Sequence, residues 1–200
     1  MEIPQTVDEA SDKYLALKSE EDLRSYYDDN GYVVMRNLVP AGLCNELLQH
    51  FTQEVKTYKG FIYRQASANP EKHKFTQSGF MLNSILNLQS VDSQHFPNFR
   101  KTGVGILSHP NIQKALNTLM GEPAKLVQSM YFEGNPVTWA HQDCYYLDSE
   151  RDGAMIGIWL ALEDIHPAGG RFYISPPSHK IDIKKNGGDF DIAFHHDRYK

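Results

Sequence analysis

The chain has 200 residues, of which 40% are hydrophobic and 22% are charged, and this composition suits a single globular domain spanning residues 1–200. Its net charge of −5 argues against broad nucleic-acid binding, because neutralising phosphates requires a basic face. Two cysteines, Cys44 and Cys144, do not make a disulfide framework, so we expect a reducing, cytoplasmic compartment. No apolar run approaches the ~18 residues of a membrane span, and the polar N-terminus has no signal-peptide core, so we expect no membrane partner.

The first part of the chain is predicted to be mostly helical, over residues 20–123, after a loosely ordered polar segment at 1–18. Acidic residues at 20–22 favour the first turn of a helix, and Asn30-Gly31 favours its end. In chain order, the further predicted elements are a strand at 32–35, a helix starting near Pro40, a loop at 64–79, a short helix at 81–88, a helix at 110–120 and strands at 126–132, 154–162 and 171–174.

The predicted strands gather in residues 124–200, which we expect to form the first part of a β core. The run 154–162 is apolar on both faces in the period of a strand, so both faces are expected to be covered. Helices first and strands later indicate an α+β domain whose centre is a mainly antiparallel β structure.

One short motif carries metal chemistry. In an extended strand the side chains of His141 and Asp143 point to the same face, where an imidazole and a carboxylate can hold one metal ion. A second histidine from a distant strand would complete a two-His-one-carboxylate triad with open positions. About one His-x-acid triplet is expected by chance from nine histidines and 25 acidic residues, and the chain also contains His195-His196-Asp197. A hydrogen-bonded His–Asp pair at a strand end is therefore the alternative interpretation.

The context of the motif resembles a known family. After His141-Gln142-Asp143 come a Trp-bearing strand at 157–164, a glycine turn at 168–170 and finally the sequence Pro176-Pro177-Ser178-His179-Lys180. This order, together with the helix–strand–helix entry that begins at Tyr26, resembles the phytanoyl-CoA dioxygenase family over residues 20–57 and 124–180. Pro177 stands where the family usually has Gly, which is a small departure within the turn.

The resemblance implies a double-stranded β-helix (a jelly roll, cupin-like) and the chemistry of the Fe(II)/2-oxoglutarate-dependent oxygenases. Fe(II) would be held by His141 and Asp143, with 2-oxoglutarate as co-substrate and O2 as oxidant. A small-molecule substrate would be hydroxylated, with release of succinate and CO2. The 2-oxoglutarate site is expected to include the following residues: Met130, Gln142, Tyr146 and Trp159. Core packing is an alternative role for Met130 and Tyr146.

The family's second ligating histidine, and an Arg that pairs with the far carboxylate of 2-oxoglutarate, come late in its sequences. We expect both beyond Lys200, so that the jelly roll is incomplete at the C-terminus of this chain. Within the chain, His195 and His196 are the candidates for the third ligand, and Arg198 is the candidate for the anchor. His179 closes the turn in the family and is not expected to bind iron.

Two other functions remain open at this stage. One is a non-catalytic jelly-roll binding module with an incomplete metal site, and the other is a cupin-type metal enzyme that does not use 2-oxoglutarate. A nucleotide-binding function is not indicated, because Gly103-Val104-Gly105 lacks the third glycine of a dinucleotide fingerprint. The sequence names neither the substrate nor the oligomeric state.

Overall fold

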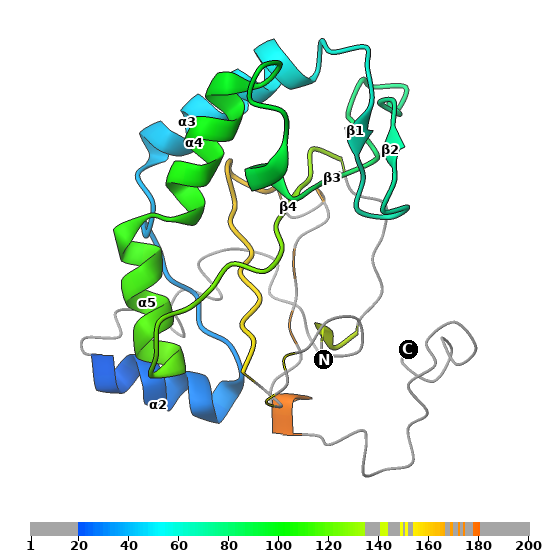
Figure 1. Ribbon diagram of the computed structural model, residues 1–200. Coiled ribbons are helices and arrows are strands. Elements are labelled where there is room, and N and C mark those ends of the chain that lie inside the picture. Colours follow the sequence, from blue (N-terminus) through cyan, green and yellow to red (C-terminus); the bar gives the residue numbers. More distant parts are fainter. Residues whose placement is uncertain are drawn as a thin grey trace.

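The computed structural model describes residues 20–134, 141–143, 154–166 and 178–180, together with the single positions 149, 151, 169, 172 and 174. This part combines helices with small antiparallel sheets, and Figure 1 shows the helices along one side and the strands beside them. In chain order the elements are α2 (Glu20–Asn30), α3 (Ala41–His50), η1 (Phe51–Val55), β1 (Ile62–Tyr63), β2 (Pro70–Glu71), β3 (Ile85–Leu86), η2 (Leu88–Ser90), α4 (Pro97–Leu107), α5 (Pro110–Met120), β4 (Met130–Tyr131) and η4 (Ser178–Lys180).

Helices α2 and α5 have the ends that their sequences predict. Three acidic residues occupy the first turn of α2, and Gly31 follows the helix with a φ of 76°. Pro110 begins α5, and Gly121 follows it with a φ of 74°. The two helices pack together, and the Arg24 guanidinium of α2 donates a hydrogen bond of 2.6 Å to the Leu119 carbonyl at the end of α5. The helix predicted at 110–120 is confirmed.

The helix predicted from the apolar spacing after Pro40 is also confirmed, and it continues as the π-helix η1. Its apolar face is buried, with Phe51 2% and Val55 0% exposed, and it packs against α4. The Glu54 carboxylate lies at the N-terminus of α4, where it accepts a hydrogen bond of 3.0 Å from the Phe99 backbone N–H. A carboxylate at this position satisfies N–H groups that have no partner within the helix and complements the helix dipole.

Helix α4 is not among the elements expected from the sequence, because Gly103 and Gly105 lower its helix propensity. The structure gives Gly103 a packing role. A Cβ atom at this position would lie 2.1 Å from a methyl group of the buried Leu88, so only glycine lets α4 approach η2 this closely. Gly105 has no atom within 4 Å of the corresponding position.

Four short strands form two antiparallel pairs. Strand β1 pairs with β2, and β3 pairs with β4 in a register that places Ile85 opposite Tyr131 and Leu86 opposite Met130. Because side chains alternate along a strand, the first of these pairs faces the core and the second faces away from it. The Tyr131 ring packs 4.6 Å from the ring of Phe51, and burial raises the pKa of its phenol well above the usual range.

The segment predicted as a loop at 64–79 contains β2 and is tied down by a buried guanidinium. Arg64 is 1% exposed and donates hydrogen bonds to the Asn83 carbonyl (2.9 Å) and to Nδ1 of His73 (2.9 Å). Nε2 of His73 lies 2.8 Å from the Val55 carbonyl. Arg64 can only donate and a carbonyl can only accept, so His73 is neutral and carries its proton on Nε2.

Three local predictions are wrong. Residues 81–88 do not form a helix, because Ile85 pairs with β4 and Asn87 has a φ of 54°. Residues 32–35 and 154–162 are not assigned as strands, and no segment in the described ranges pairs with either of them. In Figure 1 the yellow-to-orange segment 154–166 runs uncoiled through the middle of the molecule, with Leu160 and Leu162 packed against the core.

The predicted strand at 126–132 is found only as β4, Met130–Tyr131. The prediction for 171–174 falls partly outside the described residues, and those for 1–18 and for most of 167–200 fall outside them. Every described helix has 11 residues or fewer, and none is long and apolar enough to cross a membrane.

Candidate metal site

The two predicted metal ligands lie side by side. Nε2 of His141 is 3.2 Å from Oδ1 of Asp143. The His141 side chain is 24% exposed, whereas that of Asp143 is 68% exposed. The imidazole is therefore partly covered, whereas the carboxylate lies at the surface of the described part.

The distance between these atoms fits two neighbouring ligands of one metal ion. Nitrogen and oxygen ligands of a divalent metal lie about 2.1 Å from it, and neighbouring ligands about 90° apart are therefore about 3 Å from each other. An imidazole nitrogen and a carboxylate oxygen are also the donors that non-haem Fe(II) prefers in a facial triad. The same distance also fits the alternative interpretation, a hydrogen-bonded His–Asp pair without a metal ion.

The Asp143 carboxylate lies close to the backbone of Gly157. A Cβ atom on Gly157 would lie 3.0 Å from Oδ2 of Asp143, which is closer than real Cβ atoms normally approach. The absence of a side chain at 157 thus leaves the space that the carboxylate fills. This contact joins the His141–Asp143 segment to the segment 154–166.

Gln142 lies between the two candidate ligands and is anchored to the turn at η4. Its Nε2 donates a hydrogen bond of 2.9 Å to the Ser178 carbonyl. The next residue, His179, directs its Nε2 at the Asp28 carbonyl of α2, at 3.0 Å. His179 is thus placed at the end of a helix, and the expectation that it is not a metal ligand stays a prediction.

The predicted 2-oxoglutarate residues lie on two other segments. Trp159 is 49% exposed and stacks on Phe172, with ring centroids 5.7 Å apart. Met130 is 44% exposed and stands opposite Leu86 on the face of β3–β4 that points away from the core. The structure thus joins His141, Asp143 and Gly157 directly, and it places Trp159 and Met130 on exposed faces of separate segments.

Four predicted site residues fall outside the described residues, namely Tyr146, His195, His196 and Arg198. Their roles stay predictions. Within the described ranges, no group of three or more His, Cys, Asp or Glu side chains is arranged to hold a metal ion.

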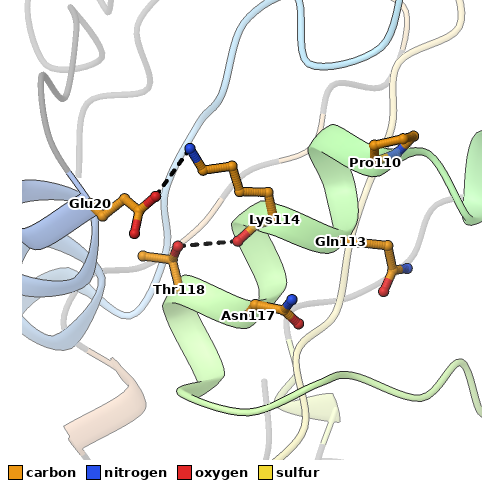
Figure 2. Close-up of a pocket in the computed structure, with 6 residues that line it drawn as sticks. All are labelled: Glu20, Pro110, Gln113, Lys114, Asn117 and Thr118. Atoms are coloured by element: carbon orange, nitrogen blue, oxygen red, sulfur yellow. Dashed lines mark hydrogen bonds and ion pairs between the residues drawn. The ribbon is translucent and has the colours of Figure 1, made fainter.

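Two surface cavities lie among other residues. One, of about 510 Å³, is lined mainly by aromatic and apolar side chains from 58–63 and 86–96. The other, of about 470 Å³, lies beside α5 where Glu20 of α2 reaches it, and Figure 2 shows the Lys114–Glu20 ion pair (3.0 Å) across it. Neither cavity is lined by His141 or Asp143, so neither marks the candidate metal site.

Comparison with known proteins decides the family. The family model described as phytanoyl-CoA dioxygenase (PhyH) matches residues 27–198, which is most of the chain. The chain belongs to this family. The resemblance inferred from the His141-Gln142-Asp143 context is therefore confirmed.

Curated relatives in the phytanoyl-CoA dioxygenase family are distant. The chain is 25% identical to the human peroxisomal phytanoyl-CoA dioxygenase over 170 residues, which is 80% of this chain and 48% of that protein. It is 31% identical to the mouse phytanoyl-CoA dioxygenase domain-containing protein 1 over 123 residues (58% of this chain, 41% of that protein), and 29% identical to the rat protein of the same name over 168 residues (78% and 56%). The chain spans about half the length of these relatives. No solved structure gives a significant match.

Some residues around the site are not identified by sequence reasoning. The contact of Gly157 with Asp143 has a visible signal, because a glycine within an apolar strand-like run often marks a close approach of another group. The hydrogen bond from Gln142 to Ser178 has no such signal, since its acceptor is a backbone carbonyl. Gly31 was predicted only as a helix end, and its contact with His179 is an additional role.

Proposed function

We propose that this chain is a non-haem Fe(II)/2-oxoglutarate-dependent oxygenase that hydroxylates a small organic substrate with release of succinate and CO2. The observation that carries the proposal is the distance of 3.2 Å between Nε2 of His141 and Oδ1 of Asp143, in a member of a family named for its dioxygenases. The jelly roll belongs to this proposal, with 124–200 as the first part of the β core.

The two candidate ligands would contribute differently to metal binding. His141 would bind through the lone pair of a neutral imidazole nitrogen, and Asp143 would add a negative charge that offsets part of the charge of the metal ion. Two ligands from one short segment leave the remaining positions for a third protein ligand, 2-oxoglutarate and O2. When bound, the iron would supply the redox chemistry that couples oxidation of 2-oxoglutarate to hydroxylation of the substrate.

The aromatic side chains would shape the pocket around this centre. The stacked rings of Trp159 and Phe172 offer an apolar wall that would exclude water, and Met130 offers a flexible apolar surface. Gln142 would lie at the 2-oxoglutarate site, as the family resemblance implies, and Tyr146 would line the same pocket. Within the chain, His195 and His196 are the candidates for the third ligand, and Arg198 is the candidate for the carboxylate anchor. The name of the human relative makes an acyl-CoA the first substrate class to test, although small amino-acid derivatives and secondary metabolites belong to the same trial.

The cytoplasmic location also stays a proposal. Cys44 is a free, buried thiol, as suits a reducing compartment. The human relative is named as peroxisomal, so the first experiment on location should compare these two compartments.

Succinate release tests the proposed function. The purified protein is incubated in air with Fe(II) and 2-oxoglutarate, with and without candidate substrates, and succinate is measured. We expect the wild type to form succinate, and both His141→Ala and Asp143→Ala to lose nearly all of this activity. The matched control is His95→Ala, which removes the imidazole of an exposed His–Asp pair elsewhere in the chain and should leave the rate unchanged. Succinate formation that is equal in all four proteins, or absent in all four when they also carry the third ligand expected beyond Lys200, would overturn the proposal.

A further inference from the structure

The C-terminal end of α2 is joined to the turn at η4 by one histidine. The last carbonyl groups of a helix have no partner within it, and the Asp28 carbonyl is one of these. Nε2 of His179 lies 3.0 Å from this carbonyl, and because a carbonyl can only accept, the imidazole donates. Figure 1 shows η4 in orange beside the end of α2 in blue.

Gly31 makes room for the histidine ring. It follows α2 with a φ of 76°, and a Cβ atom on it would lie 2.3 Å from Nδ1 of His179. Any side chain at 31 would therefore have to displace the ring, in addition to the strain of a positive φ. The ring is thus fixed in two ways, by a hydrogen bond at Nε2 and by close packing against Gly31.

The same turn holds the candidate ligands. Ser178 precedes His179, and its carbonyl accepts the hydrogen bond of 2.9 Å from Nε2 of Gln142. Gln142 is flanked by His141 and Asp143, so its side chain fixes the backbone that carries both of them. A continuous series of contacts thus runs from α2 through His179, Ser178 and Gln142 to the candidate metal ligands.

We propose that His179 and Gln142 are positioning residues, which hold the His141–Asp143 pair in its binding geometry by tying it to the end of α2. Groups behind the ligands of a metal orient them, and their removal commonly lowers metal affinity about 10- to 100-fold. The part of this proposal that concerns metal affinity rests on the proposed function. The part that concerns the contacts does not, and the two parts are tested separately.

The contacts are tested on the metal-free protein by the side-chain NH2 signals of Gln142 in a 1H–15N correlation spectrum, assigned through their loss in Gln142→Glu. In the wild type, we expect these signals to be displaced from the shifts of solvent-exposed glutamines, because one of the two protons is donated to the Ser178 carbonyl. His179→Ala should move both proton signals to the shifts of solvent-exposed glutamines. His179→Gln, whose amide can donate to the Asp28 carbonyl, should restore most of the wild-type shift.

Lys180→Ala is the matched control for the same turn. Among the described residues, its ammonium group pairs only with Asp29, in a long, exposed ion pair of 3.9 Å, so its removal should leave the Gln142 signals unchanged. A Gln142 signal at the exposed position in the wild type, or one that His179→Ala does not move, would overturn the proposal. Thermal unfolding of each variant shows whether the fold is retained.

Metal affinity is then compared by anaerobic Fe(II) titration. We expect His179→Ala and Gln142→Ala each to weaken binding at least tenfold, Lys180→Ala to leave it unchanged, and His179→Gln to recover much of it. Equal affinity in wild type and His179→Ala overturns the positioning role. Absence of binding in the wild type counts against the proposed function and against the metal-affinity part of this proposal. The Gln142 signals still decide whether the contacts through His179 hold Gln142 in place.

Discussion

The carboxylate of Asp143 rests against Gly157, at a place where a Cβ atom would be only 3.0 Å from Oδ2. Asp143 is one of the two candidate metal ligands, and Gly157 lies on the separate segment 154–166 that carries Trp159. A side chain at 157 would therefore press on the carboxylate in its present position. This contact lets the geometry of the site be altered without removing a ligand.

Gly157→Ala should disturb metal binding while both ligands remain. The added methyl group would lie 3.0 Å from Oδ2, so the Asp143 carboxylate would have to shift slightly, and we expect Fe(II) affinity to fall. Anaerobic titration of the variant and the wild type measures the change. Gly42→Ala, at a position with no atom within 4 Å, is the control and should bind like the wild type. Unchanged affinity in Gly157→Ala would show that the contact does not orient the carboxylate.

Substitution by alanine should change the free energy of unfolding in opposite directions at the two glycines of α4. Gly103→Ala would press a methyl group into the buried Leu88, and we expect a loss of about 1–3 kcal/mol in the free energy of unfolding. Gly105→Ala meets open space in the same helix and should gain about 0.5–1 kcal/mol from the higher helix propensity of alanine. Denaturant unfolding measures both. A gain in stability for Gly103→Ala would contradict the packing between α4 and η2.

The stability of the protein should fall on acidification because of His73. Burial lowers the pKa of His73 in the folded protein, and the neighbouring Arg64 lowers it further. The unfolded chain therefore binds this proton more readily, so the contribution is fully present above the unfolded pKa of about 6.5 and is lost as the pH falls from there through the folded pKa.

His73→Gln separates this effect from the other histidines. Its amide group can still donate to the Val55 carbonyl and accept from Arg64, but it does not titrate. We expect the difference in the free energy of unfolding between pH 7.5 and pH 5 to be smaller in this variant than in the wild type. Parallel pH profiles for the two proteins would show that His73 carries no such dependence.

Removing the Glu54 carboxylate should lower the free energy of unfolding more than removing the neighbouring Gln53 side chain. It accepts from the N–H groups at the start of that helix, and loss of such a cap costs about 0.5–2 kcal/mol. We expect Glu54→Ala to lower the free energy of unfolding by that amount, measured by denaturant titration, and Gln53→Ala, at an exposed neighbour, to change it by less than about 0.5 kcal/mol. Equal effects of the two variants would argue against the cap.

Local signals in the sequence predicted local structure well. Helix α5 and the helix after Pro40 follow from apolar spacing and terminal residues, which act within a few positions of the chain. Strand β3 was mistaken for a helix, because Met81, Ile85 and Leu88 have helical spacing and the pairing of Ile85 with Tyr131 joins distant residues. A long-range partner of this kind leaves no mark on the spacing of the segment itself.

The candidate metal site shows the same difference between local signals and long-range contacts. The i, i+2 spacing predicts the proximity of His141 and Asp143, and the structure brings their atoms within 3.2 Å although it assigns no strand to residues 141–143. The supports of the pair, from Gly157 and Ser178, come from segments that only the fold brings near. The family could be recognised from the order of several short motifs, whereas the substrate is encoded in no short motif of this chain.

The most direct test of the central claim is anaerobic titration of the purified protein, first with Fe(II) and then with 2-oxoglutarate, while its visible absorbance is recorded. A 2-oxoglutarate molecule chelated to iron in the site would give a charge-transfer band. We predict that this band appears in the wild type and is abolished by either His141→Ala or Asp143→Ala. A band that survives both substitutions, or no band in a wild-type protein that also carries the third ligand expected beyond Lys200, would contradict the assignment of these residues as iron ligands.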